Sequence, residues 1–168
     1  MRAPRVFATV GTQLPFDRLL LALNDWAARR PQACVTAQTG QTEHHFSALH
    51  CATHLATPEF ARHLLAADVI VSHAGMGTIL MAAEAGKPLI VLPRRAALGE
   101  HRNDHQLATA ARMAGLSNVT ILPDAAALAE TLDAALARRP APWARPAAAQ
   151  PRLIAALRAF IQGDGPRT

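Results

Sequence analysis

Residues 68–78 read Asp-Val-Ile-Val-Ser-His-Ala-Gly-Met-Gly-Thr, and this segment decides the fold. Its first half is a short, unbroken apolar run, which is typical of a strand that helices cover on both faces. Its second half passes through two glycines, Gly75 and Gly77, and continues into residues with a helical period. A buried strand that leads through a glycine-containing turn into a helix predicts a βα unit of a parallel sheet.

The same alternation of short β-rich runs and longer helix-period runs extends over most of the chain. It predicts strands over residues 5–10, 33–38, 69–72, 88–92 and 118–122, with a weaker candidate at 48–51. It predicts helices over residues 17–29, 58–67, 78–85, 104–113 and 125–137. For the second of these helices we expect Thr57 as the N-cap and Pro58 as the first helical residue. The expected fold class is therefore α/β, a Rossmann-like parallel sheet with helices on both faces.

The composition of the chain changes near residue 139. We expect one domain over residues 1–138, because a chain of 168 residues is long enough to bury one core. Residues 139–150 are rich in Pro and Ala, which predicts an extended connector. Residues 151–162 carry apolar side chains at helical spacing. They predict an amphipathic helix that packs on the domain, with a partner or a membrane as the alternative contact.

The bulk composition points to a cytoplasmic chain. Hydrophobic residues make up 51% of it, yet no apolar run approaches the roughly 18 residues of a membrane span. Residues 1–5 lead directly into the first expected strand and show no signal-peptide pattern. The two cysteines, Cys34 and Cys51, are too few for a disulfide framework, so we expect free and mostly buried thiols.

The net charge of +5 favours an anionic partner such as a phosphate-bearing ligand, nucleic acid or an acidic membrane surface. Nucleic acid is disfavoured, because aromatic residues are only 4% of the chain, lysine occurs once, and the arginines are scattered. We therefore expect no nucleic-acid partner.

Two turns between an expected strand and the following helix are candidates for anion binding, since free backbone N–H groups and the helix dipole converge at such places. The first consists of Gly11, Thr12 and Gln13, where a glycine permits close backbone approach and Thr12 adds a hydroxyl. A plain strand-to-helix turn without any ligand explains this tripeptide equally well.

The second turn is the glycine-containing end of residues 68–78. There the N–H groups of Met76, Gly77 and Thr78 can face a phosphate, and His73 can donate from a ring nitrogen. A dinucleotide fingerprint requires a third glycine where this chain has Leu80, so NAD and FAD are disfavoured. The turn instead fits a diphosphate.

A polar segment follows the strand expected at residues 88–92. It contains Asn103, Asp104, His105 and Gln106, which offer donors and acceptors suited to sugar hydroxyls. The alternative is a solvated loop with a helix cap. His101 and His105 are four residues apart, but no third metal ligand is evident, so we expect a solvated pair and no metal site.

Four motifs in order resemble the C-terminal domain of glycosyltransferase family 28. They are Val-Gly-Thr-Gln at 10–13, the Ser72–Thr78 turn, Glu-Ala-Gly-Lys-Pro at 84–88 and Asn-Asp-His-Gln at 103–106. The resemblance spans roughly residues 5–135. It is strongest for single-domain members, such as the catalytic subunit of two-part UDP-N-acetylglucosamine transferases and bacterial exopolysaccharide glycosyltransferase subunits. It implies the donor-binding, C-terminal half of a GT-B fold.

The resemblance also implies which residues bind a UDP-sugar donor. The glycine loop and the His-x-Gly-x-Gly turn hold the diphosphate, and the pair equivalent to His105 and Gln106 contacts the transferred sugar, with Asn103 and Asp104 beside it. Many relatives place a ribose-binding glutamate where this chain has Met81. Glu84 lies three residues later on the same helix face, and we expect it to take that role with the helix or the nucleotide placed about one turn differently; the alternative is a surface glutamate.

The implied activity is an inverting, metal-independent hexosyl transfer to a lipid-linked or polysaccharide acceptor, with no cofactor. A general base is required, and no residue of the sequence identifies it. We therefore expect a separate membrane-associated subunit that binds the acceptor and holds this chain at the inner face of the membrane; a homo-oligomer is left open. The alternatives are a non-catalytic nucleotide-sugar sensor and a structural interaction module.

Overall fold

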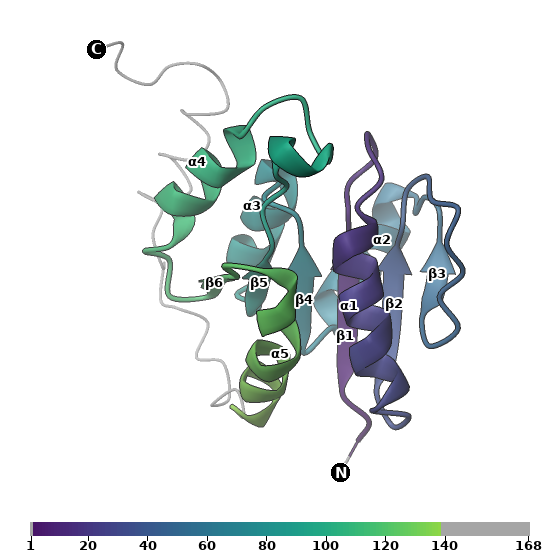
Figure 1. Cartoon of the computed structure of the whole chain (residues 1–168). Coiled ribbons are helices and arrows are strands. Elements are labelled where there is room, and N and C mark those ends of the chain that lie inside the picture. The colour runs from purple at the N-terminus through teal and green to yellow at the C-terminus, as the bar shows by residue number, and fades with distance from the viewer. Residues whose placement is uncertain (1, 139–168) are drawn as a thin grey trace.

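The computed structural model describes residues 2–138, which form one sheet with helices on both faces (Figure 1). All neighbouring strands are parallel, in the order β3-β2-β1-β4-β5-β6. The strands are β1 (Arg5–Thr9), β2 (Cys34–Gln38), β3 (His50–Ala52), β4 (Val69–Ser72), β5 (Leu89–Val91) and β6 (Val119–Ile121). The predicted α/β class and parallel sheet are confirmed.

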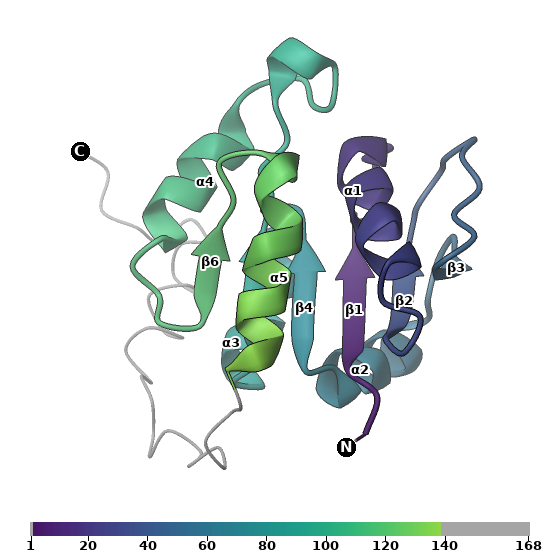
Figure 2. The same cartoon turned by 60° about the horizontal axis from the view of Figure 1, so that its bottom comes forward.

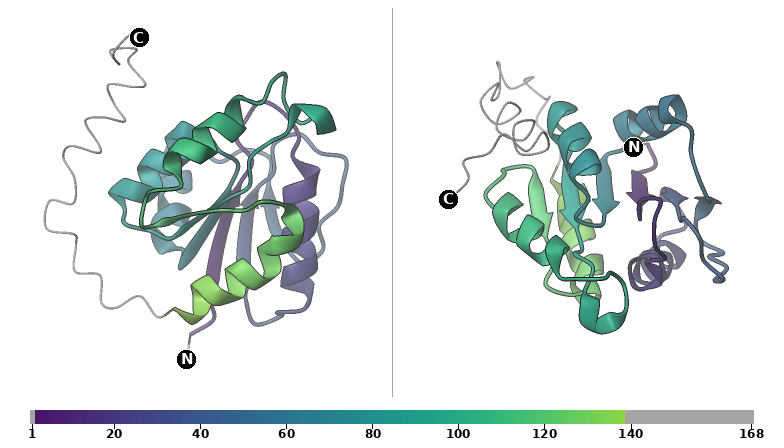
Figure 3. Two further views of the ribbon diagram at one scale, coloured as in Figure 1. Left: turned by 60° about the vertical axis from the view of Figure 1, so that its left-hand side comes forward. Right: turned by 90° about the horizontal axis from the view of Figure 1, so that it is seen from above.

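The helices form two layers around the sheet. They are α1 (Asp17–Ala28), α2 (Thr57–Ala66), α3 (Met76–Glu84), α4 (His105–Met113) and α5 (Leu128–Ala137), with 3₁₀ turns at Ala96–Leu98 and Ala125–Ala127. Helices α1 and α5 share one buried cluster with the sheet, and α2, α3 and α4 share the other. Figure 2 shows α1 and α5 in front of the strands, and Figure 3 shows α2 and α3 on the opposite side.

Strand β4 shows why its apolar run is continuous. Val69 and Val71 pack into the cluster under α1 and α5, whereas Ile70 packs into the cluster on the other face. All three side chains are at most 1% exposed. Alternate residues of a strand point to opposite faces, so a strand with helices on both sides requires apolar residues at every position. Each such side chain contributes roughly 1.5–3 kcal/mol through burial.

The strand order creates a switch point between β1 and β4. The chain leaves β1 towards α1 on one face of the sheet and leaves β4 towards α3 on the other. Parallel sheets with this order bind ligands in the crevice at the carboxyl ends of the two central strands. Both candidate anion-binding turns therefore lie at the place where the topology favours a ligand.

Most predicted boundaries agree with the structure to within one or two residues, and the weaker strand candidate is real but lies at residues 50–52. The prediction for Thr57 is wrong. Thr57 is itself the first helical residue and Ala56 occupies the N-cap position, so Pro58 is second in the helix. Helix α3 begins at Met76, two residues before the predicted start, because Gly75 serves as its N-cap.

Cys34 and Cys51 are free, as predicted, but both are exposed. The prediction of burial is wrong because Cys51 lies in β3, the edge strand, and Cys34 is the exposed first residue of β2. The predicted connector at 139–150 and helix at 151–162 lie outside the described residues. Between residues 2 and 138, no helix combines the length and the apolar character that a membrane span requires.

Candidate functional site

Three segments converge beyond the carboxyl ends of the central strands (Figure 1). We call residues 10–16, between β1 and α1, the β1 loop. We call residues 73–75, between β4 and α3, the β4 turn, and residues 92–104, between β5 and α4, the β5 segment. The β1 loop and the β4 turn flank the switch point, and the β5 segment is bonded to both.

The N-terminus of α3 offers unpaired backbone donors. Gly75 is the N-cap and provides no side-chain cap, and the first helical hydrogen bond runs from Ile79 N to Gly75 O at 3.1 Å. The N–H groups of Met76, Gly77 and Thr78 thus have no partner within the described residues. Gly77 is exposed, and a Cβ built on it meets nothing within 4 Å. This helix end has the backbone donors, the dipole and the open space that an anion requires.

The imidazole of His73 occupies the space between the two turns. A Cβ on Gly75 would lie 2.3 Å from His73 Nε2, and a Cβ on Gly11 would lie 2.9 Å from His73 Cε1. Gly11 also has a φ of 79°, in the left-handed region. Both glycines are therefore required to accommodate the protein's own histidine, and not only, as we predicted, the close approach of a ligand. Of the three glycines, Gly77 alone faces open space.

His73 is electrically neutral at physiological pH. Burial lowers its pKa to about 4, with further lowering by the Arg94 cation and by His101, and an interaction with the Thr9 backbone opposes these effects. Its Nδ1 is buried and has no hydrogen-bond partner within the described residues. A neutral imidazole has a single N–H, so His73 donates to an anion when that proton is on Nε2, and it then acts as a dipole and not as a cation.

In the β1 loop, Thr12 and Gln13 are exposed, and their backbone N–H groups bond to no other described residue. Three carbonyl oxygens of the same loop, by contrast, accept hydrogen bonds from the guanidinium of Arg94. Three acceptors of the loop are therefore paired with Arg94 inside the protein, whereas two of its donors are unpaired at the surface.

Gln106 connects the β4 turn to the β5 segment. Its side-chain oxygen accepts from Ala74 N at 3.3 Å and from Arg94 N at 3.1 Å. Its amide nitrogen bonds to no residue between 2 and 138. Because two backbone N–H groups fix the oxygen, the NH₂ group is the part of this side chain that remains for a ligand.

The other members of the predicted sugar-binding cluster are exposed, and two of them form hydrogen bonds within the chain. Asn103 Oδ1 accepts from His105 N at 3.1 Å, and Asp104 Oδ1 accepts from Ala96 N at 2.9 Å. Of the four predicted residues, Gln106 alone is hydrogen-bonded to the β4 turn. The alternative interpretation, a solvated loop that leads into a helix, therefore agrees with the contacts of Asn103 and Asp104.

Glu84 is not brought to the site. It is exposed in the last turn of α3, eight residues after Met76, which corresponds to about 12 Å along the helix axis. The expectation that Glu84 contacts a ribose therefore stays a prediction, and a surface glutamate stays its alternative. The helix places Met81 nearer, but a thioether cannot replace a carboxylate as a partner of hydroxyl groups.

His101, predicted to be solvated, is half-buried, and its Nδ1 is buried without a partner within the described residues. It lies close enough to His73 to lower the pKa of that residue.

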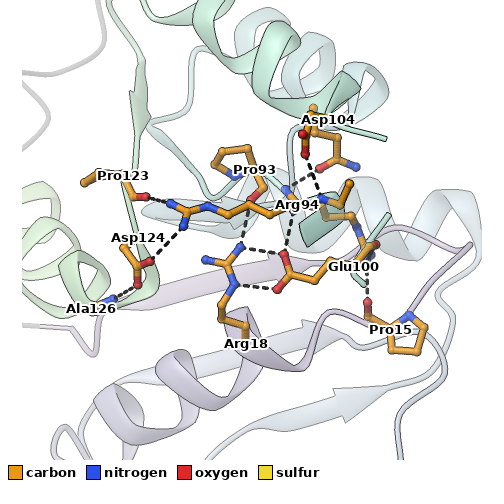
Figure 4. A network of polar contacts seen from close by, with 12 residues as sticks. Pro15, Arg18, Pro93, Arg94, Glu100, Asp104, Pro123, Asp124 and Ala126 are labelled. Atoms are coloured by element: carbon orange, nitrogen blue, oxygen red, sulfur yellow. Dashed lines mark hydrogen bonds and ion pairs between the residues drawn. The ribbon is translucent and has the colours of Figure 1, made fainter. Parts of the chain in front are cut away.

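The site also contains a network of hydrogen bonds that the sequence did not reveal. Glu100 accepts from Arg18 at 2.6 and 2.8 Å and from Arg95 N at 2.9 Å, and Arg18 reaches the Pro93 carbonyl (Figure 4).

Solved structures with a similar fold include several glycosyltransferases. A structure described as the glycotransferase of kitacinnamycin is 23% identical with a TM-score of 0.63, and covers 97% of this chain and 40% of that one. CalG4, the calicheamicin glycosyltransferase, is 18% identical with a TM-score of 0.60, covering 97% and 39%. This chain thus spans about two fifths of their length, and its fold is the C-terminal half of the GT-B fold.

Smaller proteins share the fold as well. ALG13 is 18% identical with a TM-score of 0.57, over 82% of this chain and 87% of that one. The molybdenum cofactor carrier protein of Chlamydomonas reinhardtii is 14% identical with a TM-score of 0.53, over 82% and 100%. No curated protein matches the sequence significantly. The model of the glycosyltransferase family 28 C-terminal domain, however, matches residues 5–157, and this chain belongs to that family.

Proposed function

We propose that this chain is the donor-binding part of an inverting, metal-independent hexosyltransferase, and that it binds a UDP-sugar at the crevice between β1 and β4. The observation that carries the proposal is the uncapped N-terminus of α3, which begins beside the neutral His73 at the switch point of the sheet. Membership of family 28 and the fold shared with glycosyltransferases support it.

The chemistry of transfer explains why such a helix end is useful. When an acceptor hydroxyl attacks the anomeric carbon, the bond to the UDP oxygen breaks and negative charge grows on the leaving diphosphate. Backbone N–H groups that are already oriented stabilise this charge without reorganisation. We assign this role to the amides of residues 76–78 and to His73. Within residues 2–138 no three His, Cys, Asp or Glu side chains converge on one point.

The sugar would lie on the side of the β5 segment. There the NH₂ group of Gln106 is held in place by the two bonds to its oxygen, and His105 and Asn103 are exposed beside it. We assign the general base and the acceptor site, a lipid-linked or polysaccharide acceptor, to a separate membrane-associated subunit. This assignment follows the resemblance to two-part transferases, and a transfer assay of the chain with and without membranes tests it.

Calorimetric titration of the purified chain tests donor binding. The ligands are UDP, UDP-N-acetylglucosamine, UDP-glucose, UDP-glucuronate and a GDP-sugar. We expect UDP compounds to bind and one UDP-sugar to bind more tightly than UDP itself. His73→Ala removes a phosphate donor and should weaken all of these ligands by roughly ten- to a hundredfold, about 1–3 kcal/mol. An unaltered chain that binds none of these ligands would contradict the proposal.

The role of Gln106 is tested by the ratio of two affinities. Gln106→Glu keeps an oxygen for the Ala74 and Arg94 amides but loses the NH₂ donor. The lost donor should lower the affinity for the UDP-sugar relative to UDP about tenfold while the fold is kept. The added charge repels UDP more strongly than a UDP-sugar, because UDP carries the larger negative charge, so it works against this fall and cannot produce it. Gln32→Glu makes the same change at an exposed residue just before β2, at the opposite edge of the sheet, and is the matched control. If the ratio of UDP-sugar affinity to UDP affinity is unchanged in Gln106→Glu, Gln106 does not contact the sugar.

A non-catalytic binding protein is the second candidate, favoured by the carrier protein that shares this fold. Donor binding alone does not separate the two. A transferase consumes the UDP-sugar and releases UDP when acceptor-bearing membranes and the partner are supplied, whereas a sensor leaves the UDP-sugar intact.

A further inference from the structure

Arg94 is a buried cation that bonds to no carboxylate of the described residues. Arg94 is only 2% exposed, and its guanidinium lies 4.6 Å from the centre of the Phe16 ring. It donates only to backbone carbonyls, those of Val10 at 2.7 Å, Leu14 at 2.6 Å, Pro15 at 2.5 Å and Glu100 at 3.1 Å. Burial lowers its pKa to about 10, so it keeps its charge at neutral pH.

Three of these four carbonyls belong to the β1 loop. A guanidinium is planar and presents its N–H groups in a fixed fork, so it can hold several carbonyls in one arrangement. At its two ends the loop bonds to regular structure, from Val10 N to Gln38 O and from Leu19 N and Leu20 N to Phe16 O. Between these ends, Arg94 binds the carbonyl groups on both sides of Thr12 and Gln13, whose amides remain unpaired at the surface.

The main chain of Arg94 is bonded to the other turn. Its N–H shares the Gln106 side-chain oxygen with Ala74 N of the β4 turn. The positive charge of Arg94 also contributes to the low pKa of His73, whose ring lies against Gly11 and Gly75. One residue is thus connected to both turns that flank the switch point.

The position of Arg94 is fixed by its surroundings. Glu100 binds Arg18 of α1 through two hydrogen bonds and also accepts from the N–H of Arg95 (Figure 4). The ring of Phe16 lies beneath Arg94, and the Arg18 guanidinium is 5.4 Å from the same ring. These contacts hold the β5 segment against the start of α1, on the same side as the β1 loop.

We propose that Arg94 is a positioning residue for the diphosphate of the donor. It holds the β1 loop so that the Thr12 and Gln13 amides complete, together with the N-terminus of α3, a single site for two phosphates. The charge of the guanidinium adds attraction for the anion without direct contact. This inference rests on the proposed function, since it presupposes that the crevice binds a nucleoside diphosphate.

The test is a titration with UDP that is monitored in two ways. Calorimetry measures the affinity, and NMR measures the response of the amide resonances of Thr12, Gln13 and Gly77. Arg94→Lys keeps the charge but cannot form the fork. We expect it to bind UDP at least about tenfold more weakly and to lose the response at Thr12 and Gln13 while keeping that at Gly77. Arg95→Gln is the matched control, because Arg95 bonds outward to the Pro123 carbonyl and pairs with Asp124, and it should bind within about twofold of the unaltered chain.

Two results would overturn the inference. One is an Arg94→Lys chain that binds UDP like the unaltered chain with unchanged responses at Thr12 and Gln13. The other is an equal loss of response at Gly77 and in the loop, which indicates general structural damage. Should Arg94→Lys fail to fold, the proposal is tested in the unaltered chain by the exchange rate of the Arg94 guanidinium protons with solvent. UDP should slow this exchange, and an unchanged rate would refute the proposal.

The two proposals fail in different ways. If the unaltered chain binds no nucleotide, the donor site is wrong and this inference falls with it. If the unaltered chain binds UDP and the Arg94 variant binds it equally well, only the role of Arg94 is wrong.

Discussion

The two turns that flank the switch point are built by different means. The β4 turn spans three residues and is defined mostly by local contacts, since Gly75 N bonds to His73 O at 2.8 Å and α3 begins at once, although Ala74 N also bonds to the distant Gln106. The β1 loop spans seven residues, and its conformation depends on Arg94, about 80 positions away in the sequence. The site that we propose for two phosphates thus combines a half that is mostly encoded locally with a half that only the tertiary fold specifies.

His73 connects the two halves, and its titration is expected to give the largest effect on stability. Its folded pKa of about 4 lies below its ordinary value of 6.5, so the unfolded chain takes up a proton first as the pH falls. The stability associated with neutral His73 is fully present above pH 6.5 and is lost as the pH falls towards 4. The expected loss is roughly 3 kcal/mol.

Urea unfolding at several pH values measures this effect. His73→Asn cannot titrate in this range, so its unfolding free energy should depend less on pH by about the same amount. His105→Asn, an exposed histidine at the start of α4, is the control and should behave like the unaltered chain. Equal pH profiles for all three chains would mean that His73 is not held neutral between the turns.

Gly75→Ala is expected to have the next largest effect. The backbone at Gly75 (φ −91°, ψ 126°) accepts an alanine, but the new Cβ would lie 2.3 Å from the His73 ring. The ring must move, at a cost of about 1–3 kcal/mol, and the pKa of His73 should rise towards its ordinary value as the ring leaves its buried position. NMR titration of the His73 ring checks this, and an unchanged pKa would show that the ring is not confined there.

Gly77→Ala should have the smallest effect on the free chain and the opposite sign. Nothing lies within 4 Å of a Cβ at this position in α3, so the change should stabilise the protein by roughly 0.5–1 kcal/mol. The methyl group would nevertheless occupy space that we assign to a phosphate, so UDP should bind more weakly. Thermal unfolding and calorimetry separate the two effects. Higher stability with unchanged UDP affinity would place the nucleotide away from α3.

The features predicted correctly from the sequence are those with a local cause. The apolar run in β4, the glycines after it and the periodicity of α1 to α5 follow from neighbours in the chain, and the strands and helices agree with the structure. The convergence of the β1 loop, the β4 turn and Gln106 was also expected, because carboxyl ends of parallel strands meet at one edge.

The features that were missed or wrong depend on contacts between distant residues. No local pattern shows that Arg94 reaches the Val10 carbonyl or that Glu100 pairs with Arg18. The glycines at 11 and 75 were assigned to a ligand because the sequence does not reveal that His73 lies against both. The paired Arg94 and Arg95 directly after a buried strand were the one available signal for that network.

A crystal structure of the chain with UDP tests the central claim most directly. We expect the two phosphates to accept hydrogen bonds from the N–H groups of residues 76–78, from the His73 ring and from the amides of Thr12 and Gln13. A nucleotide bound at any other edge of the sheet, with the N-terminus of α3 left to solvent, would contradict it.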